Sequence, residues 1–249
     1  RVDNTAEKLI SFASTLKVKV NEAIIDFGKN AISSAVDGAL EMQDAEKKLA
    51  ASTGATAAEM QQYNGIMEEI YSAGYGDTIA DTADAMALVR QYTGEVDPTK
   101  IQQLAEGAMA LDDTFSNMDM EETLRGVDSL MTNMGLSAEE AFDYIVTGAQ
   151  NGLNKSGELT DNIAEYGQLW AQAGFSAQEM FTILQNGLDN GAYNLDKVND
   201  FVKEFGISLS DGRIEENLSS FSSETQNLFT AWQNGQATTK DVFYSVIKD

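Results

Sequence analysis

The chain has 249 residues and a net charge of −24, and it contains one proline, no cysteine and no histidine. Without cysteine and histidine it lacks disulfides, thiolate nucleophiles, the usual zinc and haem ligands, and the commonest general base at neutral pH. The strong negative charge disfavours binding to phosphate backbones and to anionic membranes, so neither is an expected partner.

Residues 5–50 are predicted to form a long amphipathic helix. An apolar stripe recurs at alternating spacings of four and three residues, as in a heptad pattern; it consists of Leu9, Ala13, Leu16, Val20, Ala23 and Phe27. Because the stripe is shorter than three heptads, we interpret it as a face that packs on a core. A coiled coil, with self-association through this N-terminal helix, remains the alternative.

Charge is distributed unevenly along the chain. Residues 1–50 contain seven basic and eight acidic side chains, whereas residues 51–249 contain nine basic and 32 acidic ones. This change predicts a domain boundary near residue 50, with an acidic globular domain over residues 51–249. The chain starts at Arg1 and shows neither a signal peptide nor an apolar stretch of membrane-spanning length, so we expect it to be a piece of a longer protein.

Helix starts are well marked in the second part. Thr56 with Glu59, Ser137 with Glu140, and Ser176 with Glu179 fit the capping box, in which the hydroxyl and the carboxylate each accept a backbone N–H bond. A glycine lies two residues before each box, which suits the end of the preceding helix. Further starts are predicted at Asp97-Pro98, Asp119, Ser223 and Thr238.

These signals predict an all-α fold of packed helical hairpins. The expected helices after the N-terminal one span residues 56–73, 77–92, 98–111, 119–133, 137–147, 158–172, 176–186, 195–205, 223–234 and 239–247. Residues 206–212 alternate briefly between apolar and polar and are expected to be a short extended piece.

Residues 135–167 and 174–206 are diverged copies of one another. At an offset of 39 residues, 11 of 33 positions are identical. A fixed period near 40 residues is typical of a helical supersecondary unit used more than once. In each copy we expect a short helix ending at a glycine, an Asn-Gly loop and a second helix, with Phe142, Phe181, Tyr166 and Phe205 in the core.

Two repeated carboxylate pairs are the main candidates for chemistry. Asp161 and Glu165, and likewise Asp200 and Glu204, lie four residues apart and share a helix face. Such pairs can perform acid–base chemistry, as in glycoside hydrolysis. We favour a solvated acidic face, because the sequence shows no nucleophile, metal ligand set or aromatic cluster beside them.

Other motifs are weaker. The acidic segments 112–122 and 189–200 do not fit a calcium-binding loop. Ser14-Thr-Leu-Lys17 matches a Ser-x-x-Lys pattern by chance, and the paired glycines 148/152 and 187/191 are interpreted as helix ends and tight loops. We therefore predict no catalytic, cofactor-binding or metal-ligating residue, and no enzyme.

The repeat residues resemble the conserved region of phage tail tape measure proteins. The resemblance rests on three segments of the first copy, Gly135 to Phe142, Gly148 to Leu153 and Asp161 to Tyr166, and it continues through the second copy to Ala231-Trp-Gln-Asn-Gly235. It covers about residues 44–249. This chain has Gly167 and Gly206 where the family commonly has another residue, which puts the continuity of those two helices in question.

The resemblance implies a structural component of a phage or prophage tail that sets tail length and occupies the tail tube before DNA ejection. Implied partners are the tail tube protein, tail assembly chaperones and tail tip or baseplate proteins. The implied location is the lumen of the tail tube in the virion, and the host cytoplasm during assembly. Two alternatives remain open: a peptidoglycan-degrading tail domain, and a helical-repeat adaptor that binds other proteins.

Overall fold

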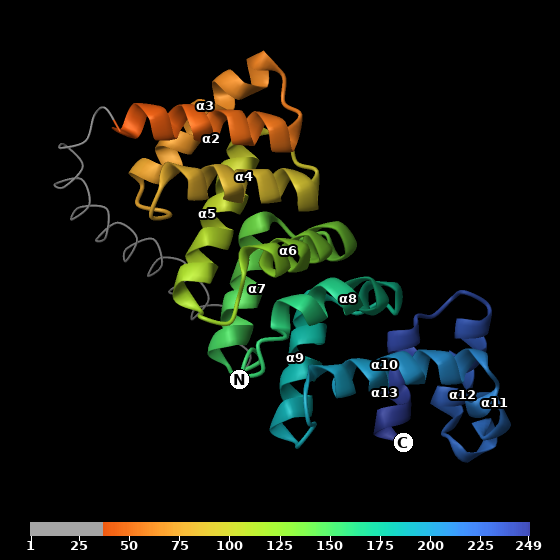
Figure 1. Ribbon diagram of the computed structural model, residues 1–249. Coiled ribbons are helices and arrows are strands. Elements are labelled where there is room, and N and C mark those ends of the chain that lie inside the picture. Colours follow the sequence, from red (N-terminus) through yellow and green to blue (C-terminus); the bar gives the residue numbers. More distant parts are fainter. Residues whose placement is uncertain (1–36) are drawn as a thin grey trace. The chain divides into compact units, whose positions relative to one another are not determined.

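The computed structural model describes residues 37–249, and this part of the chain is helical without a strand (Figure 1). The sequence-based prediction of an all-α fold is confirmed. The elements in chain order are α2 (Asp37–Thr53), α3 (Ala57–Ser72), α4 (Ile79–Thr93), α5 (Pro98–Thr114), α6 (Met120–Met134), α7 (Ala138–Gln150), α8 (Leu159–Gln172), α9 (Ala177–Asp189), α10 (Leu195–Ser210), α11 (Arg213–Glu216), the 3₁₀ turn η2 (Leu218–Ser220), α12 (Ser223–Gln233) and α13 (Thr239–Lys248).

The chain divides into two compact units. Among the described residues, the first unit comprises 37–128 and 137–147, and the second comprises 129–136 and 148–249. The predicted apolar stripe from Leu9 to Phe27 lies outside the described residues, so the boundary near residue 50 stays a prediction. The change in charge near that residue falls within α2, which continues to Thr53.

Small residues bring the helices of the first unit close together. α2 lies against α4, and α3 lies against both α4 and α5. Ala83 and Ala85 on α4, and Ala105 and Ala108 on α5, are fully buried, and their short side chains allow close contact between helices. Larger side chains fill the remaining core, namely Tyr63, Met67, Ile70, Met86, Val89, Ile101 and Leu104.

Aromatic side chains dominate the core of the second unit. Phe243 of α13 makes edge-to-face contacts with Phe175 before α9 and with Phe205 of α10, at centroid distances of 5.5 and 5.1 Å. Phe175 in turn contacts Trp170 of α8 at 5.0 Å. Such pairs contribute beyond their buried area because ring edges meet ring faces. The hairpin of α12 and α13 lies beside α10 (Figure 1). It packs there through rings as well as aliphatic side chains.

Most predicted helix starts are confirmed. Thr56 and Ser176 form complete capping boxes, and the box of Ser137 with Glu140 has both bonds, at 2.8 and 3.2 Å. Asp97 caps α5 with Pro98 in the first turn, Asp119 caps α6, and Thr238 caps α13. Two details differ: Ser222 caps α12 rather than Ser223, and an additional box of Thr78 with Asp81 begins α4.

The predicted extended piece at residues 206–212 is wrong. α10 continues through Gly206 to Ser210, which places Leu209 in the core beside Phe229 and Val242. Leu209 reaches the core because the helix continues for one more turn. The free energy gained by burying this side chain outweighs the low helix propensity of Gly206. The helices at Gly167 and Gly206 are both continuous.

Gly148 and Gly187 do not end their helices, contrary to the prediction. They lie within α7 and α9, and the chain reverses direction only at Gly152 and Gly191, which have φ of +90° and +97°. A Cβ at position 148 would lie 3.0 Å from the Phe181 ring, and one at position 187 would collide with Val198. These glycines are therefore required for close helix contact.

The two repeat segments match in part. α7 and α9 have 13 residues each, and their bounds differ by the 39-residue offset at both ends. α8 and α10 begin at different repeat positions, because the loop before α8 is longer. The structural equivalence of the two copies stays a prediction.

Candidate functional site

The predicted carboxylate pairs lie on two helices of the second unit. Asp161 and Glu165 are on α8, and Asp200 and Glu204 are on α10. In the second pair, Asp200 lies 3.4 Å from the ammonium of Lys197 and Glu204 lies 3.3 Å from the guanidinium of Arg213. Both carboxylates are thus compensated by cations, as expected of an ordinary charged helix surface.

The predicted core aromatics are buried to different degrees. Tyr166 and Phe181 are buried, whereas Phe142 and Phe205 are only partly so. Burial, followed by the neighbouring Glu165 carboxylate, raises the pKa of Tyr166 to about 12. Phe142 packs on Gly107 of α5, and Phe181 packs on Gly148 of α7, so each repeat phenylalanine lies on a glycine of an earlier helix.

An acidic hollow lies in the first unit. Its volume is about 310 Å³, and its carboxylates come from Asp77, Asp81, Asp84, Asp112 and Asp113. Partial burial, and then neighbouring carboxylates, raise the pKa of Asp112 and of Asp113. Lys48 neutralises one wall through Asp84 at 2.7 Å, and Asp81 caps α4.

No metal centre forms from these groups within residues 37–249, where no three potential ligand side chains are grouped to hold an ion. The hollow can attract cations without offering them a defined coordination shell.

The two Asn-Gly loops of the repeat come together in the second unit. A hollow of about 230 Å³ is lined by residues 151–153, 155 and 156 of one loop and by residues 188, 189 and 192–195 around the other. Tyr193 lines this hollow and is 91% exposed. Asn154, which the sequence did not single out, is buried below the first loop and accepts a bond from the Leu159 amide at 3.0 Å, which fixes the start of α8.

A wider apolar groove runs between α8 and α10. It has a volume of about 520 Å³, and its apolar walls come from Leu169, Val202 and Ile207. Gly206 lies in the groove, and a Cβ there would meet no other atom within 4 Å. Ile207 is 41% exposed. Leu169 and Ile207 offer contact area for another apolar side chain, and Lys203, Ser210, Asp211 and Thr239 supply the polar part of the lining.

A chain of buried polar groups joins α8 to α10. The indole N–H of Trp170 donates to Asn199 Oδ1 at 2.7 Å, and Asn199 Nδ2 donates to Asn162 Oδ1 at 2.6 Å. Asn162 Nδ2 then donates to the Glu158 carbonyl at 3.0 Å. Each side chain in this chain is hydrogen-bonded to the next, so the chain fixes how α8 meets α10.

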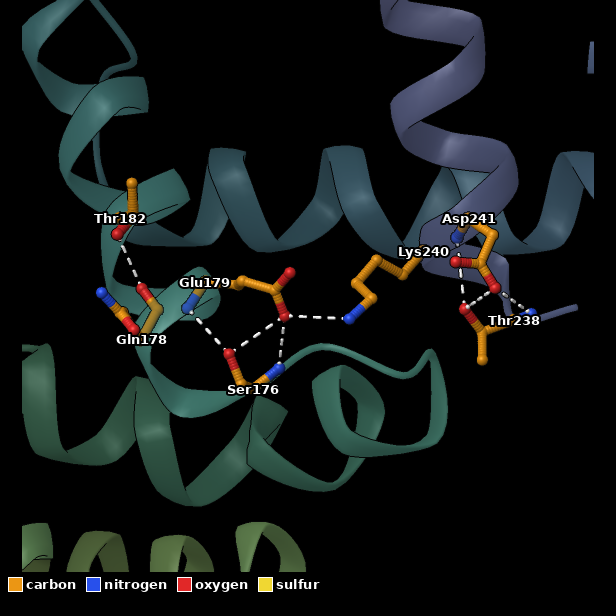
Figure 2. Close-up of polar contacts among 7 residues, drawn as sticks. All are labelled: Ser176, Gln178, Glu179, Thr182, Thr238, Lys240 and Asp241. Atoms are coloured by element: carbon orange, nitrogen blue, oxygen red, sulfur yellow. Dashed lines mark hydrogen bonds and ion pairs between the residues drawn. The ribbon is translucent and has the colours of Figure 1, made fainter.

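The densest polar arrangement in the second unit lies at the corner between α8 and α9. Figure 2 shows Ser176 and Glu179 in the capping box of α9, with Lys240 of α13 reaching the same carboxylate. The Lys240 backbone N–H also donates to the Ala173 carbonyl at 2.9 Å. Sequence reasoning found the capping box but missed Lys240, because no local spacing connects residues 61 positions apart.

The pKa of Glu179 is lowered by this arrangement. Partial burial raises it, but the N–H and hydroxyl bonds from Ser176 and the ammonium of Lys240 outweigh that effect. The pKa of Glu140 in the matching box of α7 is lowered through Ser137 alone. These carboxylates are held ionised as structural acceptors, which is unsuited to a general acid at neutral pH.

No helix within residues 37–249 combines the length and apolar character needed to cross a bilayer. Nor does any solved structure match the chain.

Comparison with known sequences identifies a phage relative and a matching family. A stretch of 38 residues is 55% identical to a probable tape measure protein of Streptomyces phage phiC31. The stretch covers 15% of this chain and 5% of that relative, so the chain corresponds to a small part of the relative's length. The model of the family described as phage-related minor tail protein matches residues 69–243, which is well over half of the chain. The chain belongs to the phage-related minor tail protein family.

Proposed function

We propose that this chain is a folded, non-enzymatic module of a tape measure protein in a phage tail. The observation that carries the proposal is the family match over residues 69–243, supported by the relative named as a tape measure protein. The described fold adds support, because polar side chains such as Asn199 and Glu179 join helices and cap them.

The module is distinct from the part of the protein that measures length. An extended α-helix advances about 1.5 Å per residue, so a tape measure converts residue number into tail length when its helices run on end to end. Here the longest described helices have 17 residues, and successive helices fold back into hairpins. The described residues therefore add little length, and the predicted helix at residues 5–50 is the better candidate for a measuring segment.

The acidic surface suits a protein that shares a tube with DNA. The described residues of the first unit contain 22 acidic and five basic side chains. Such a surface repels phosphate groups and lets a genome pass without adhering. We place the module in the lumen of the virion tail tube, where the tube protein and tail tip proteins are its neighbours, with tail assembly chaperones as partners in the host cytoplasm.

An in-frame deletion in the phage tests the division of roles. Removing residues 135–206 should shorten the tails in electron micrographs by far less than about 1.5 Å for each lost residue. A control deletion of 28 residues, four heptads, from the predicted helix at residues 5–50 should shorten them by about that amount per residue. Proportional shortening by both deletions would show that the module measures length itself.

A zymogram separates this function from the peptidoglycan-degrading alternative. The purified chain should leave no cleared zone in a gel that contains peptidoglycan, whereas lysozyme run beside it should clear one. A cleared zone that survives purification to homogeneity would contradict the non-enzymatic proposal.

A further inference from the structure

The start of α9 and the start of α13 share one carboxylate oxygen. Oε2 of Glu179 accepts the Ser176 N–H at 2.8 Å and the Ser176 hydroxyl at 3.0 Å, which are bonds of the α9 cap. The same atom lies 3.2 Å from the ammonium of Lys240 on α13 (Figure 2). Both side chains of the ion pair are about three-quarters shielded from solvent, so water screens them less than a fully exposed pair.

Two further contacts hold α13 at the same corner. The Lys240 amide donates to the Ala173 carbonyl at 2.9 Å, at the end of α8. Gly174 has φ of +93°, and a Cβ there would lie 2.8 Å from the Cβ of Thr238, the cap of α13. The left-handed glycine both turns the chain from α8 towards α9 and leaves room for Thr238. These contacts all involve residues 173–179, as do the ring contacts of Phe175 with Phe243 and Tyr244 of α13.

The hairpin of α12 and α13 carries its own closing bonds. The Asp249 carboxylate accepts the Ser222 N–H at 2.9 Å and the Thr225 hydroxyl at 2.8 Å, and the Thr225 and Ser245 hydroxyls lie 2.6 Å apart. Asp241 completes the capping box of Thr238 at the start of α13. None of these bonds involves residues 173–179, so they survive when α13 moves away from the corner.

We propose that α13 and the first turn of α9 form one conformational latch, in which the Glu179 carboxylate couples the capping of α9 to the docking of α13. Loss of Lys240 leaves Glu179 free to rotate away from Ser176, which loosens the first turn of α9. Loss of the Glu179 charge releases Lys240 and, with it, the bond from its amide to Ala173. The two helix starts therefore open together. This inference does not depend on the role of the chain in a phage tail.

The first copy of the repeat supplies a matched control. Ser137 and Glu140 form the same capping box on α7, with bonds of 2.8 and 3.2 Å. Glu140 has no ion-pair partner in the structure as described, whereas Glu179 has Lys240. A substitution at Glu140 thus reports the loss of a cap alone, and the same substitution at Glu179 reports the loss of a cap and a latch.

Amide hydrogen exchange of the full chain, followed by NMR under native conditions, tests the coupling. Lys240→Ala should speed exchange of the Glu179 and Met180 amides about threefold to tenfold, the range expected from losing a partly shielded ion pair and a helix cap. Glu179→Gln should speed exchange of the Lys240 amide by a similar factor. Glu140→Gln should speed exchange only in the first turn of α7.

The double variant Glu179→Gln with Lys240→Ala completes a thermodynamic cycle. The latch predicts that the Glu179, Met180 and Lys240 amides exchange no faster in the double variant than in the more strongly affected single variant. The reason is that both substitutions break the same coupling. Additive effects, or effects confined to the helix that carries each substitution, would overturn the proposal. Urea unfolding of each variant identifies changes in exchange that arise from global destabilisation, and exchange that follows global stability alone would also overturn it.

Discussion

The two repeat copies show how one sequence pattern supports two environments. At matching positions, Asn162 of α8 is 2% exposed and bonded to Asn199, whereas Phe201 of α10 is 57% exposed. Two residues earlier in each copy, the buried side chains also differ. The Thr160 hydroxyl of α8 makes no hydrogen bond, whereas the Asn199 amide of α10 is bonded through both its oxygen and its nitrogen. Matching positions of α8 and α10 thus differ in burial in one pair and in hydrogen bonding in the other.

The repeat therefore specifies the backbone geometry of each copy more strongly than its side-chain contacts. The caps, the first helices and the loop glycines agree between the copies, but the side chains between α8 and α10 are unique to that interface. Substitutions at matching positions should therefore have unequal effects, and free energies of unfolding measured in urea by far-ultraviolet circular dichroism can test each pair.

The largest expected difference is between positions 199 and 160. Asn199→Ala leaves the Trp170 N–H and the Asn162 carbonyl oxygen buried without partners, and it should lower the free energy of unfolding by about 2–4 kcal/mol. Thr160→Val removes a buried hydroxyl that has no hydrogen bond, so it should change stability by less than about 0.5 kcal/mol. Similar losses of stability at both positions would contradict the difference in hydrogen bonding between them.

Gly167 and Gly206, which occupy matching positions inside α8 and α10, should respond with opposite signs. A Cβ at Gly167 would collide with Ser129 Oγ, which donates to the Ile163 carbonyl at 3.0 Å, so Gly167→Ala should cost about 1–3 kcal/mol. Gly206→Ala meets no atom within 4 Å and should gain about 0.5–1 kcal/mol from helix propensity. A loss of stability in Gly206→Ala would show that the groove beside it is filled in solution.

Positions 162 and 201 should differ more modestly. Asn162→Ala leaves the Asn199 N–H without its acceptor and should cost about 2 kcal/mol. Phe201→Ala loses part of the ring contact with Phe243, whose centroid is 5.9 Å away, and should cost about 1 kcal/mol because the ring is already more than half exposed. A larger loss for Phe201→Ala than for Asn162→Ala would reverse our assignment of the two environments.

The smallest effect concerns the two capping carboxylates and pH. The folded-state pKa of Glu179 lies below its ordinary value of 4.5, so its stabilisation is present above that value and is lost as pH falls through the folded pKa. Glu179→Gln should therefore melt at a lower temperature than the parent chain at pH 7, and the difference should vanish as the pH falls below the folded-state pKa of Glu179.

Salt distinguishes the two boxes in this experiment. The ion pair with Lys240 is weakened by 1 M NaCl, because the Debye length falls to about 3 Å, whereas the hydrogen bonds of either box persist. The melting difference for Glu179→Gln should shrink in salt, and that for Glu140→Gln should shrink less. Equal salt effects would indicate that Lys240 adds nothing to the Glu179 box.

Local signals in the sequence were sufficient to predict most of the fold. The capping boxes at Thr56, Ser137 and Ser176 locate three helix starts because hydroxyl and carboxylate lie within one turn. The predicted helix ends at Gly148, Gly187 and Gly206 are wrong for one reason. Glycine marks both a reversal of the chain and a close helix contact or groove, and only tertiary structure distinguishes these uses.

The polar contacts between distant helices of the second unit could not be predicted from the sequence. Trp170 and Asn199 are 29 residues apart, and Glu179 and Lys240 are 61 residues apart. No periodicity links such positions, because their approach depends on how α10 and α13 cross α8 and α9. The sequence did predict a helix end at Gly174 and a helix start at Ser176, but not that a later helix would bind there.

Both tryptophans of the chain, Trp170 and Trp232, lie in the second unit. Trp170 is enclosed and bonded to Asn199, and Trp232 stacks on Phe229 at a centroid distance of 5.8 Å. Intrinsic fluorescence excited near 295 nm therefore observes only residues 129–136 and 148–249, whereas circular dichroism sums every helix. The natural sequence thus carries an optical label on one unit, and separate melting of the two units can be detected without attaching a dye.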